Sequence, residues 1–230
     1  MLKFYYNTAP NPMKVALFLE EVGLEYRPVP VDSRAGDQFK PQYVAINPNA
    51  KAPAIVDDGN VVFDSNAILL YLGEKTGKFM PQNSLKTRGE LLSWMMFVAS
   101  GIGPYSGQSV HFRHFAPAGL DYAVNRYLYE AERHYDILDT LLAERPYMLG
   151  DTYTIVDMCV WGWARIIPRV IGEGELEKRP NLKRLVDEIS ARPAAERAVS
   201  IKDRFEHTFK NEMDADAQRF MFPQNQRFAG

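Results

Sequence analysis

The order of strand-like and helix-like patterns in the first eighty residues constrains the fold most. Leu2–Tyr6 is a short apolar run typical of a strand, and the apolar residues that follow recur at three- and four-residue spacing, which predicts an amphipathic helix ending near Gly23. Glu25–Val31 has the pattern of a second strand. The chain therefore begins with a β-α-β unit.

Four more elements are expected before residue 80. They are a helix over Asp37–Ala45, strands over Ala54–Asp57 and Val61–Phe63, and a helix over Ser65–Thr76. Asp58-Gly59 is a tight-turn sequence between the two strands, and Gly77 closes the last helix. The first eighty residues thus predict the order β-α-β-α-β-β-α.

The sequence changes in character after Met80. Pro81–Asn83 is polar, and from about Leu85 helical patterns replace strands, with Tyr122–Leu142 as the clearest long helix and a stop or kink expected near Gly101–Pro104. We therefore predict an α/β domain over residues 1–80, a linker over 81–86, an all-helical domain over 87–202 and a surface tail over 203–230.

Charge and cysteine content exclude several classes of protein. Among 230 residues, 27 are basic and 29 acidic, so no overall field attracts nucleic acid or an anionic membrane, and neither is expected as a partner. Cys159 is the one cysteine, and no clustered Cys/His spacing suggests a metal site. No stretch approaches the roughly 20 apolar residues of a membrane span, and the first residues lack the long apolar core of a signal peptide. We expect a cytoplasmic protein without a metal.

Asn11 stands at the mouth of the first helix, between Pro10 and Pro12. One interpretation is a capped helix, with Asn11 at the N-cap and Pro12 at the first helical position. In the other, the N–H groups and positive dipole end of the helix stabilise an anion such as a thiolate. No cysteine occurs in this part of the chain, so the sulfur would have to arrive on a ligand.

Two further sequences open elements in the same half of the chain. Ala52-Pro53 begins a strand, either as an edge or turn proline with a trans bond or as a cis-proline that leaves the preceding backbone free to pair with an extended, peptide-like ligand. Asp64-Ser65 opens a helix, either as its N-cap or as a site where the helix end holds a ligand carboxylate and Asp64 binds an ammonium group.

Together these sequences resemble the cytosolic glutathione transferases. The resemblance covers roughly residues 1–200 and rests on Asn11-Pro12, Lys51–Val56, Asp64–Ile68 and Leu149–Asp157. Within the last of these, Thr154–Asp157 is similar to the folding-related capping box of the family's helical domain. The resemblance implies an α/β thioredoxin-like domain of order β-α-β-α-β-β-α followed by an all-α domain, which is the glutathione transferase fold.

Within this family the chain is most similar to the group of bacterial Nu-class proteins and Ure2-like yeast prion proteins. The sequences that carry this likeness are Gly36–Phe39, Asn47–Lys51, Gly107–Phe112, Ala116-Pro117 and Asp121–Tyr127. That group activates glutathione with a Thr-Pro-Asn turn instead of the Tyr, Ser or Cys of other classes. The turn here is Thr8-Ala9-Pro10-Asn11, in which Asn11 matches and Thr8 lies one residue early.

The resemblance implies that the chain binds glutathione as a co-substrate. Asn11, with Thr8, would donate hydrogen bonds to the thiolate and lower a thiol pKa that is ordinarily about 8.5. The rest of the tripeptide would contact Ala52, beside Pro53, at the cysteinyl peptide, Asp64 and Ser65 at the γ-glutamyl end, Lys51 and Gln38 near the glycyl carboxylate, and Arg126, which reaches the site of a partner subunit in a homodimer.

Other residues are candidates by type only. Tyr5 and Tyr6 could face the sulfur, but a strand directs them to opposite faces. Cys159 lies in an apolar helical run, which predicts a buried, inert thiol. Two groups complete the set: His111 and His114, which lack a third metal ligand, and the aromatic residues Trp94, Phe97, Tyr105, Phe112 and Phe115, which line an electrophile pocket or belong to the core.

Two functions follow from these expectations. The first is a glutathione-dependent transferase or disulfide reductase, whose bound thiolate attacks small disulfides, peroxides or electrophiles without any protein cysteine. The second is a non-catalytic glutathione-binding or regulatory protein that keeps the fold, as in Ure2-like proteins. Turnover of a model disulfide or aryl halide distinguishes them.

Overall fold

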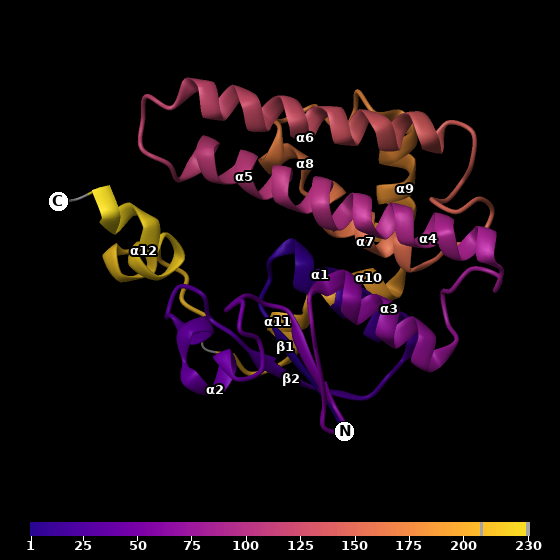
Figure 1. Cartoon of the computed structure of the whole chain (residues 1–230), viewed down its shortest axis with the longest axis horizontal. Helices are drawn as coiled ribbons and strands as arrows, with labels where there is room; N and C mark the ends of the chain where they lie inside the picture. The colour runs from indigo at the N-terminus through magenta and orange to yellow at the C-terminus, as the bar shows by residue number, and fades with distance from the viewer. Residues whose placement is uncertain (208, 229–230) are drawn as a thin grey trace. The chain divides into compact units, whose positions relative to one another are not determined.

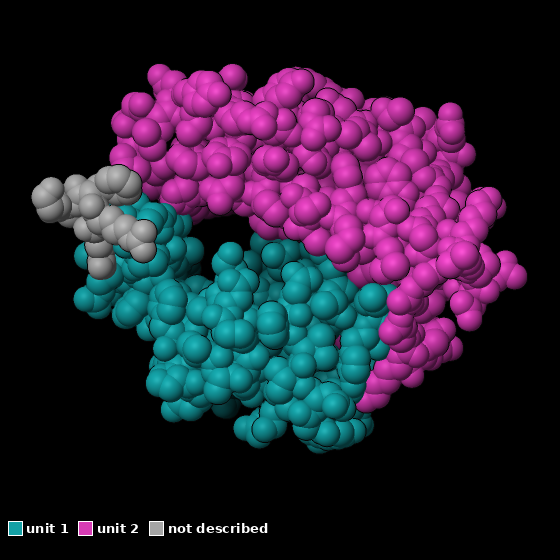
Figure 2. All heavy atoms as spheres, viewed as in Figure 1, with its two compact units in different colours: residues 1–71, 197–230 teal, residues 72–196 magenta. Residues whose placement is uncertain are grey.

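The computed structural model describes residues 1–207 and 209–228, with the backbone alone at residues 226–228. It contains two compact units, which Figure 2 shows in different colours: Met1–Tyr71 together with Arg197–Gly230, and Leu72–Glu196. The domain limits predicted at residues 80, 86 and 202 stay predictions. Residues 208, 229 and 230 of the predicted tail lie outside the described residues.

The first unit begins with the predicted series of strands and helices (Figure 1). In chain order these are β1 (Leu2–Tyr6), α1 (Pro10–Val22), β2 (Tyr26–Pro30), η1 (Asp37–Phe39), α2 (Pro41–Val44), β3 (Ala54–Asp57), β4 (Asn60–Phe63) and α3 (Ser65–Thr76). The helix expected over Asp37–Ala45 consists instead of two short pieces, η1 and α2. Lys40, which precedes Pro41, is extended because a residue before proline is driven out of the helical region.

The strands form a mixed sheet of order β2-β1-β3-β4. β1 pairs with β2 in parallel, and the β1–β3 and β3–β4 pairs are antiparallel. Side chains alternate along β1, so that Phe4 and Tyr6 are fully buried on one face. Tyr5 points to the other face, where it packs with Tyr43 of α2.

The second unit is helical in its described residues. Its helices are α4 (Leu85–Phe97), η2 (Val98–Ile102), α5 (Gly103–His114), α6 (Asp121–Leu142), α7 (Ile155–Ala164), α8 (Ile167–Val170), α9 (Pro180–Ser190) and the start of α10 (Pro193–Val199). None of the helices in the described part of the chain is long and apolar enough to cross a membrane. The mixed α/β first unit and the helical second unit confirm the fold class predicted from the sequence.

A π-helical turn, η2, stands where the sequence predicted a stop or a kink. Such turns insert an extra residue and re-aim the helix without ending it. At Gly101 a Cβ atom would lie 2.4 Å from Nε2 of the buried His134, so the close approach of α6 requires glycine there. Pro104 then occupies the first turn of α5, where its missing N–H costs nothing.

The C-terminal segment returns to the first unit. It contains α11 (Ile201–Arg204), α12 (Ala215–Met221) and η3 (Pro223–Phe228), and α12 lies near the segment that carries α2 (Figure 1). Arg197 and Arg204 donate hydrogen bonds of 2.8 and 2.7 Å to the buried carboxylate of Glu20 in α1. The backbone N–H of Lys210 donates to Asp32 at 2.6 Å. The described part of the tail is thus anchored by charge-assisted hydrogen bonds.

Candidate glutathione site

The register of the sheet brings most of the predicted site residues to one end of the first unit. Tyr5 pairs with Ala54, and Ala54 pairs with Phe63, while Tyr6 pairs with Pro30. Hence β1, β2 and β4 all end at the same end of the sheet, where β3 begins. In this subsection and the next two, this end of the sheet is called the edge. Four segments meet at this edge: 7–11 after β1, 31–38 after β2, 51–53 before β3 and 64–65 after β4.

The start of α1 differs from the prediction. The N-cap is Ala9, which makes no side-chain cap, so the expectation of an Asn11 cap is wrong. Asn11 occupies the second helical position, because Pro10 is the first, and its side chain is partly buried. Proline has no N–H, so among residues 10–12 Asn11 alone can offer a backbone donor. One residue therefore supplies both the amide side chain and the backbone donor of this helix end.

The segment before α1 is held by a different asparagine. Asn7 accepts a hydrogen bond from the backbone N–H of Ala9 at 3.1 Å and donates one to the Ser33 hydroxyl at 3.1 Å. Thr8, between them, is exposed and precedes the helix by two residues. The structural role in this turn thus belongs to Asn7, a residue that the sequence patterns did not single out.

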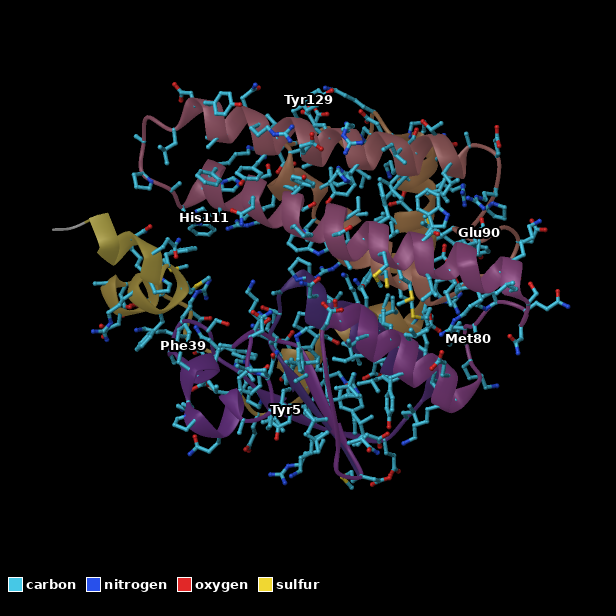
Figure 3. The ribbon with its side chains drawn as sticks, viewed as in Figure 1. Tyr5, Phe39, Met80, Glu90, His111 and Tyr129 are labelled. Carbon is cyan, nitrogen blue, oxygen red and sulfur yellow. The ribbon has the colours of Figure 1, made fainter. Side chains whose placement is uncertain are left out.

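The two tyrosines of β1 have different surroundings. Tyr6 is fully buried, stacks on Phe4 and meets Phe209 of the tail edge-on. Its hydroxyl has no hydrogen-bond partner among the described residues, and burial raises the pKa of Tyr6 above its ordinary value. Tyr5, labelled in Figure 3, packs on Tyr43 and lines a hollow of about 270 Å³ beside α2.

The bond between Ala52 and Pro53 is cis, which is the second of the two alternatives that the sequence left open. The carbonyl of Lys51, just before it, accepts hydrogen bonds from the Tyr43 hydroxyl at 2.8 Å and the Asn47 side chain at 2.5 Å. Burial raises the pKa of Tyr43 to about 12, so this hydroxyl stays protonated and can donate. The backbone at Ala52 is thereby held in place, while the Lys51 side chain is exposed.

The start of α3 combines a cap with a buried positive charge. Asp64 is exposed, has a φ of 72°, and accepts hydrogen bonds from the backbone N–H groups of Asn66 and Ala67 at 2.9 and 3.2 Å. Ser65 and Asn66 are buried, and the ammonium of Lys14 in α1 lies 3.4 Å from the Ser65 hydroxyl and 3.4 Å from the side-chain oxygen of Asn66. Lys14 itself is 1% exposed. This lysine was not predicted from the sequence, because it lies within an otherwise apolar helix pattern.

Gln38 is held by the C-terminal tail. Its side-chain nitrogen donates to the backbone carbonyls of Ser33 at 3.2 Å and Phe220 at 3.3 Å. Its side-chain oxygen is buried without a partner among the described residues. The Phe220 ring covers Gly36, where a Cβ atom would lie 2.7 Å from it. Gln38 thus depends on a segment more than 180 residues away, a contact that local patterns cannot predict.

Arg126 belongs to the second unit, Leu72–Glu196. It lies on α6 and forms an ion pair of 2.6 Å with the buried Glu130. This hydrogen bond raises the pKa of Arg126 above its ordinary value. Its role at a glutathione site, in the same or a partner subunit, stays a prediction.

The remaining candidates of the second unit have ordinary surroundings. Cys159 is buried, which confirms the expectation of a buried thiol. His114 lies 2.9 Å from the Arg169 carbonyl, and the described residues include no group of three or more His, Cys, Asp or Glu that could hold a metal. The candidate pocket aromatics make ring contacts in this unit: Trp94 with Phe97, Tyr105 and Phe112 with Tyr127, and Phe115 with His114.

Family models identify the class of protein. The N-terminal domain of glutathione S-transferases matches residues 2–74 and the C-terminal domain matches residues 108–193. The chain belongs to the glutathione S-transferase family. This agrees with the mixed sheet, the cis-proline and the helical second unit.

Particular relatives refine this comparison. The disulfide-bond oxidoreductase YfcG of Escherichia coli is 39% identical over 206 residues, which are 86% of this chain and 94% of that protein. The URE2 protein of Candida albicans is 30% identical over 236 residues, 85% of this chain and 68% of that protein. A glutathione transferase from Burkholderia graminis, solved with two glutathione molecules bound per subunit, has a TM-score of 0.81 at 33% identity and covers 89% of each chain.

Proposed function

We propose that this chain is a glutathione-dependent disulfide-bond reductase. The observation that carries the proposal is the register of the sheet, which places Asn11, the cis Ala52-Pro53 bond and Ser65 at one edge of the first unit. The name of the Escherichia coli relative and the two glutathione molecules bound to the Burkholderia protein support it. In this proposal the chain supplies the binding site and the ligand supplies the sulfur.

Different residues of the edge bind different parts of glutathione. Asn11 donates to the thiolate, with Thr8 as a second candidate, and the backbone of Ala52 pairs with the cysteinyl peptide. Asp64 and Ser65 bind the γ-glutamyl end, and Gln38 and Lys51 bind near the glycyl carboxylate. Arg126 is assigned to the site of a partner subunit in the homodimer. Because a hydrogen bond to a charged acceptor is stronger than one to a neutral group, donors at the sulfur favour the ionised form.

The reaction then needs two glutathione molecules. The first thiolate attacks one sulfur of the disulfide, forms a mixed disulfide with it and releases the other half as a thiolate, which takes up a proton. A second glutathione thiolate attacks the glutathione sulfur of the mixed disulfide, which yields glutathione disulfide and the second substrate thiol. Two thiols are oxidised and one disulfide is reduced, so the electrons balance.

The test is turnover of hydroxyethyl disulfide by the purified chain with glutathione, followed as glutathione disulfide formation. We expect a rate well above the uncatalysed exchange, and the same rate in a Cys159→Ala variant, because the one protein thiol is buried. If glutathione binds but neither the disulfide nor a model aryl halide is consumed above background, the regulatory alternative, which the URE2 relative represents, replaces this proposal.

A matched variant tests the tyrosine that other classes of the family would use. Tyr6→Phe removes a buried hydroxyl without a partner in the described part of the chain, so the free energy of unfolding should stay the same or rise by about 1 kcal/mol. Disulfide reduction should remain within two-fold of wild type. A strong loss of rate in this variant would place the Tyr6 hydroxyl at the sulfur and contradict the assignment of Asn11.

A homodimer is part of the proposal. Val61 and Phe63 of the edge strand β4 remain 47% and 41% exposed, and apolar side chains on a sheet edge usually pack against another surface. Sedimentation equilibrium of the purified chain measures this directly.

A further inference from the structure

The buried residue Lys14 needs an explanation beyond the fold. It lies in α1 at 1% exposure, and its ammonium reaches the first turn of α3, 3.4 Å from both the Ser65 hydroxyl and the Asn66 side-chain oxygen. Removing an ammonium from water is costly. An uncharged side chain of similar length would join the two helices at a lower cost in free energy.

An ammonium constrains the direction of the hydrogen bonds around it, because it can only donate. The Ser65 oxygen therefore accepts from Lys14, which leaves the single hydrogen of that hydroxyl for another acceptor. The Asn66 amide is oriented in the same way, with its oxygen toward Lys14. The Asp64 carboxylate accepts hydrogen bonds from the backbone N–H groups of Asn66 and Ala67. In the first turn of α3, the backbone N–H of Ser65 is therefore the one that this cap does not include.

We propose that Lys14 is a positioning residue that makes the start of α3 selective for a carboxylate. It orients the Ser65 hydroxyl as a donor and adds a fixed positive charge behind it, next to the positive end of the helix dipole. This inference rests on the proposed function, in which the carboxylate is the α-carboxylate of the γ-glutamyl group. It assigns to Lys14 the discrimination between ligands with and without that carboxylate.

The experiment compares two ligands in three forms of the full chain. The ligands are glutathione and γ-aminobutyryl-cysteinyl-glycine, which keeps the ammonium, the thiol and the glycyl end but lacks the α-carboxylate. Dissociation constants are measured by NMR titration for wild type, Lys14→Met, which keeps the buried apolar stem, and Lys14→Arg, which restores a charge. Circular dichroism confirms the fold, and Lys14→Gln serves if Lys14→Met does not fold.

We expect Lys14→Met to weaken glutathione binding about ten-fold and to change binding of the carboxylate-free analogue by less than two-fold. Lys14→Arg should recover much of the loss in glutathione binding. Ser65→Ala should add little to Lys14→Met, since both act through one hydroxyl. Equal weakening of the two ligands would mean that Lys14 merely ties the helices together, and no change in either would remove it from the site. If wild type binds neither ligand, the proposed function itself fails.

Discussion

Replacing Asn11 by alanine is expected to lower kcat/KM for glutathione-dependent disulfide reduction by about 100-fold. The reason is that Asn11 supplies the amide donor of the α1 start, where Pro10 and Pro12 have no N–H to replace it. Without this donor the bound thiol has a higher pKa, and less thiolate is present near neutral pH. Steady-state kinetics at fixed pH measure the loss, with circular dichroism to confirm the fold.

Thr8→Ala is the matched comparison for this prediction. Thr8 is exposed and lies outside the helix, so its removal should cost less activity than that of Asn11. A variant Asn11→Ala with the wild-type rate would remove Asn11 from its role. A larger loss in Thr8→Ala would give the dominant hydrogen bond to the threonine instead.

The second large effect is expected in the helical unit, where Asp157→Ala should lower the free energy of unfolding by about 3–5 kcal/mol. The buried carboxylate of Asp157 accepts hydrogen bonds from the backbone of Met148 at 2.7 Å and of Thr154 at 2.8 Å, and from the Thr154 hydroxyl at 3.0 Å. Alanine leaves these buried donors without an acceptor. Urea unfolding measures the change, and a loss below about 1 kcal/mol would contradict this account.

The same carboxylate makes a prediction about pH. Burial raises the pKa of Asp157 to about 6, although its hydrogen bonds act in the opposite direction. Between about pH 4 and 6, the carboxyl group therefore keeps its proton in the folded chain but has lost it in the unfolded chain. Stability from this group is therefore greatest below pH 4 and falls as the pH rises toward 6, by about 3 kcal/mol at most. Relative to Asp157→Asn, wild type should lose stability between pH 4.5 and 7. A difference that does not change with pH would show that the Asp157 pKa is not raised.

Local patterns were sufficient for most of the fold. The limits of β1, β3 and α3 agree with the predicted residues. For β3 and α3 a proline or glycine stands at one border, Pro53 before β3 and Gly77 after α3. The capping box at Thr154–Asp157 is confirmed, because both partners lie within one turn of helix. The prediction for the α1 start was wrong by two residues, since the pattern does not distinguish Pro10 from Pro12 as the first helical residue.

The parts of the site that were missed depend on contacts distant in sequence. Lys14 and Ser65 are 51 residues apart, and Gln38 and Phe220 are 182 residues apart, so no local period relates them. Within the tail, Phe209 packs on Tyr6, and the backbone N–H of Lys210 donates a hydrogen bond to Asp32. Such contacts follow from the packing of the first unit as a whole, which a single sequence does not reveal.

The central claim is that the thiolate belongs to a bound tripeptide and is stabilised by donors at the start of α1. The most direct test is a pH titration of the ultraviolet thiolate absorbance of glutathione bound to wild type. We predict saturable binding and a thiol pKa one to two units below the reference value of about 8.5, shifted back toward it in Asn11→Ala. A bound thiol that titrates as it does in free glutathione, or no saturable binding at millimolar glutathione, would contradict the account.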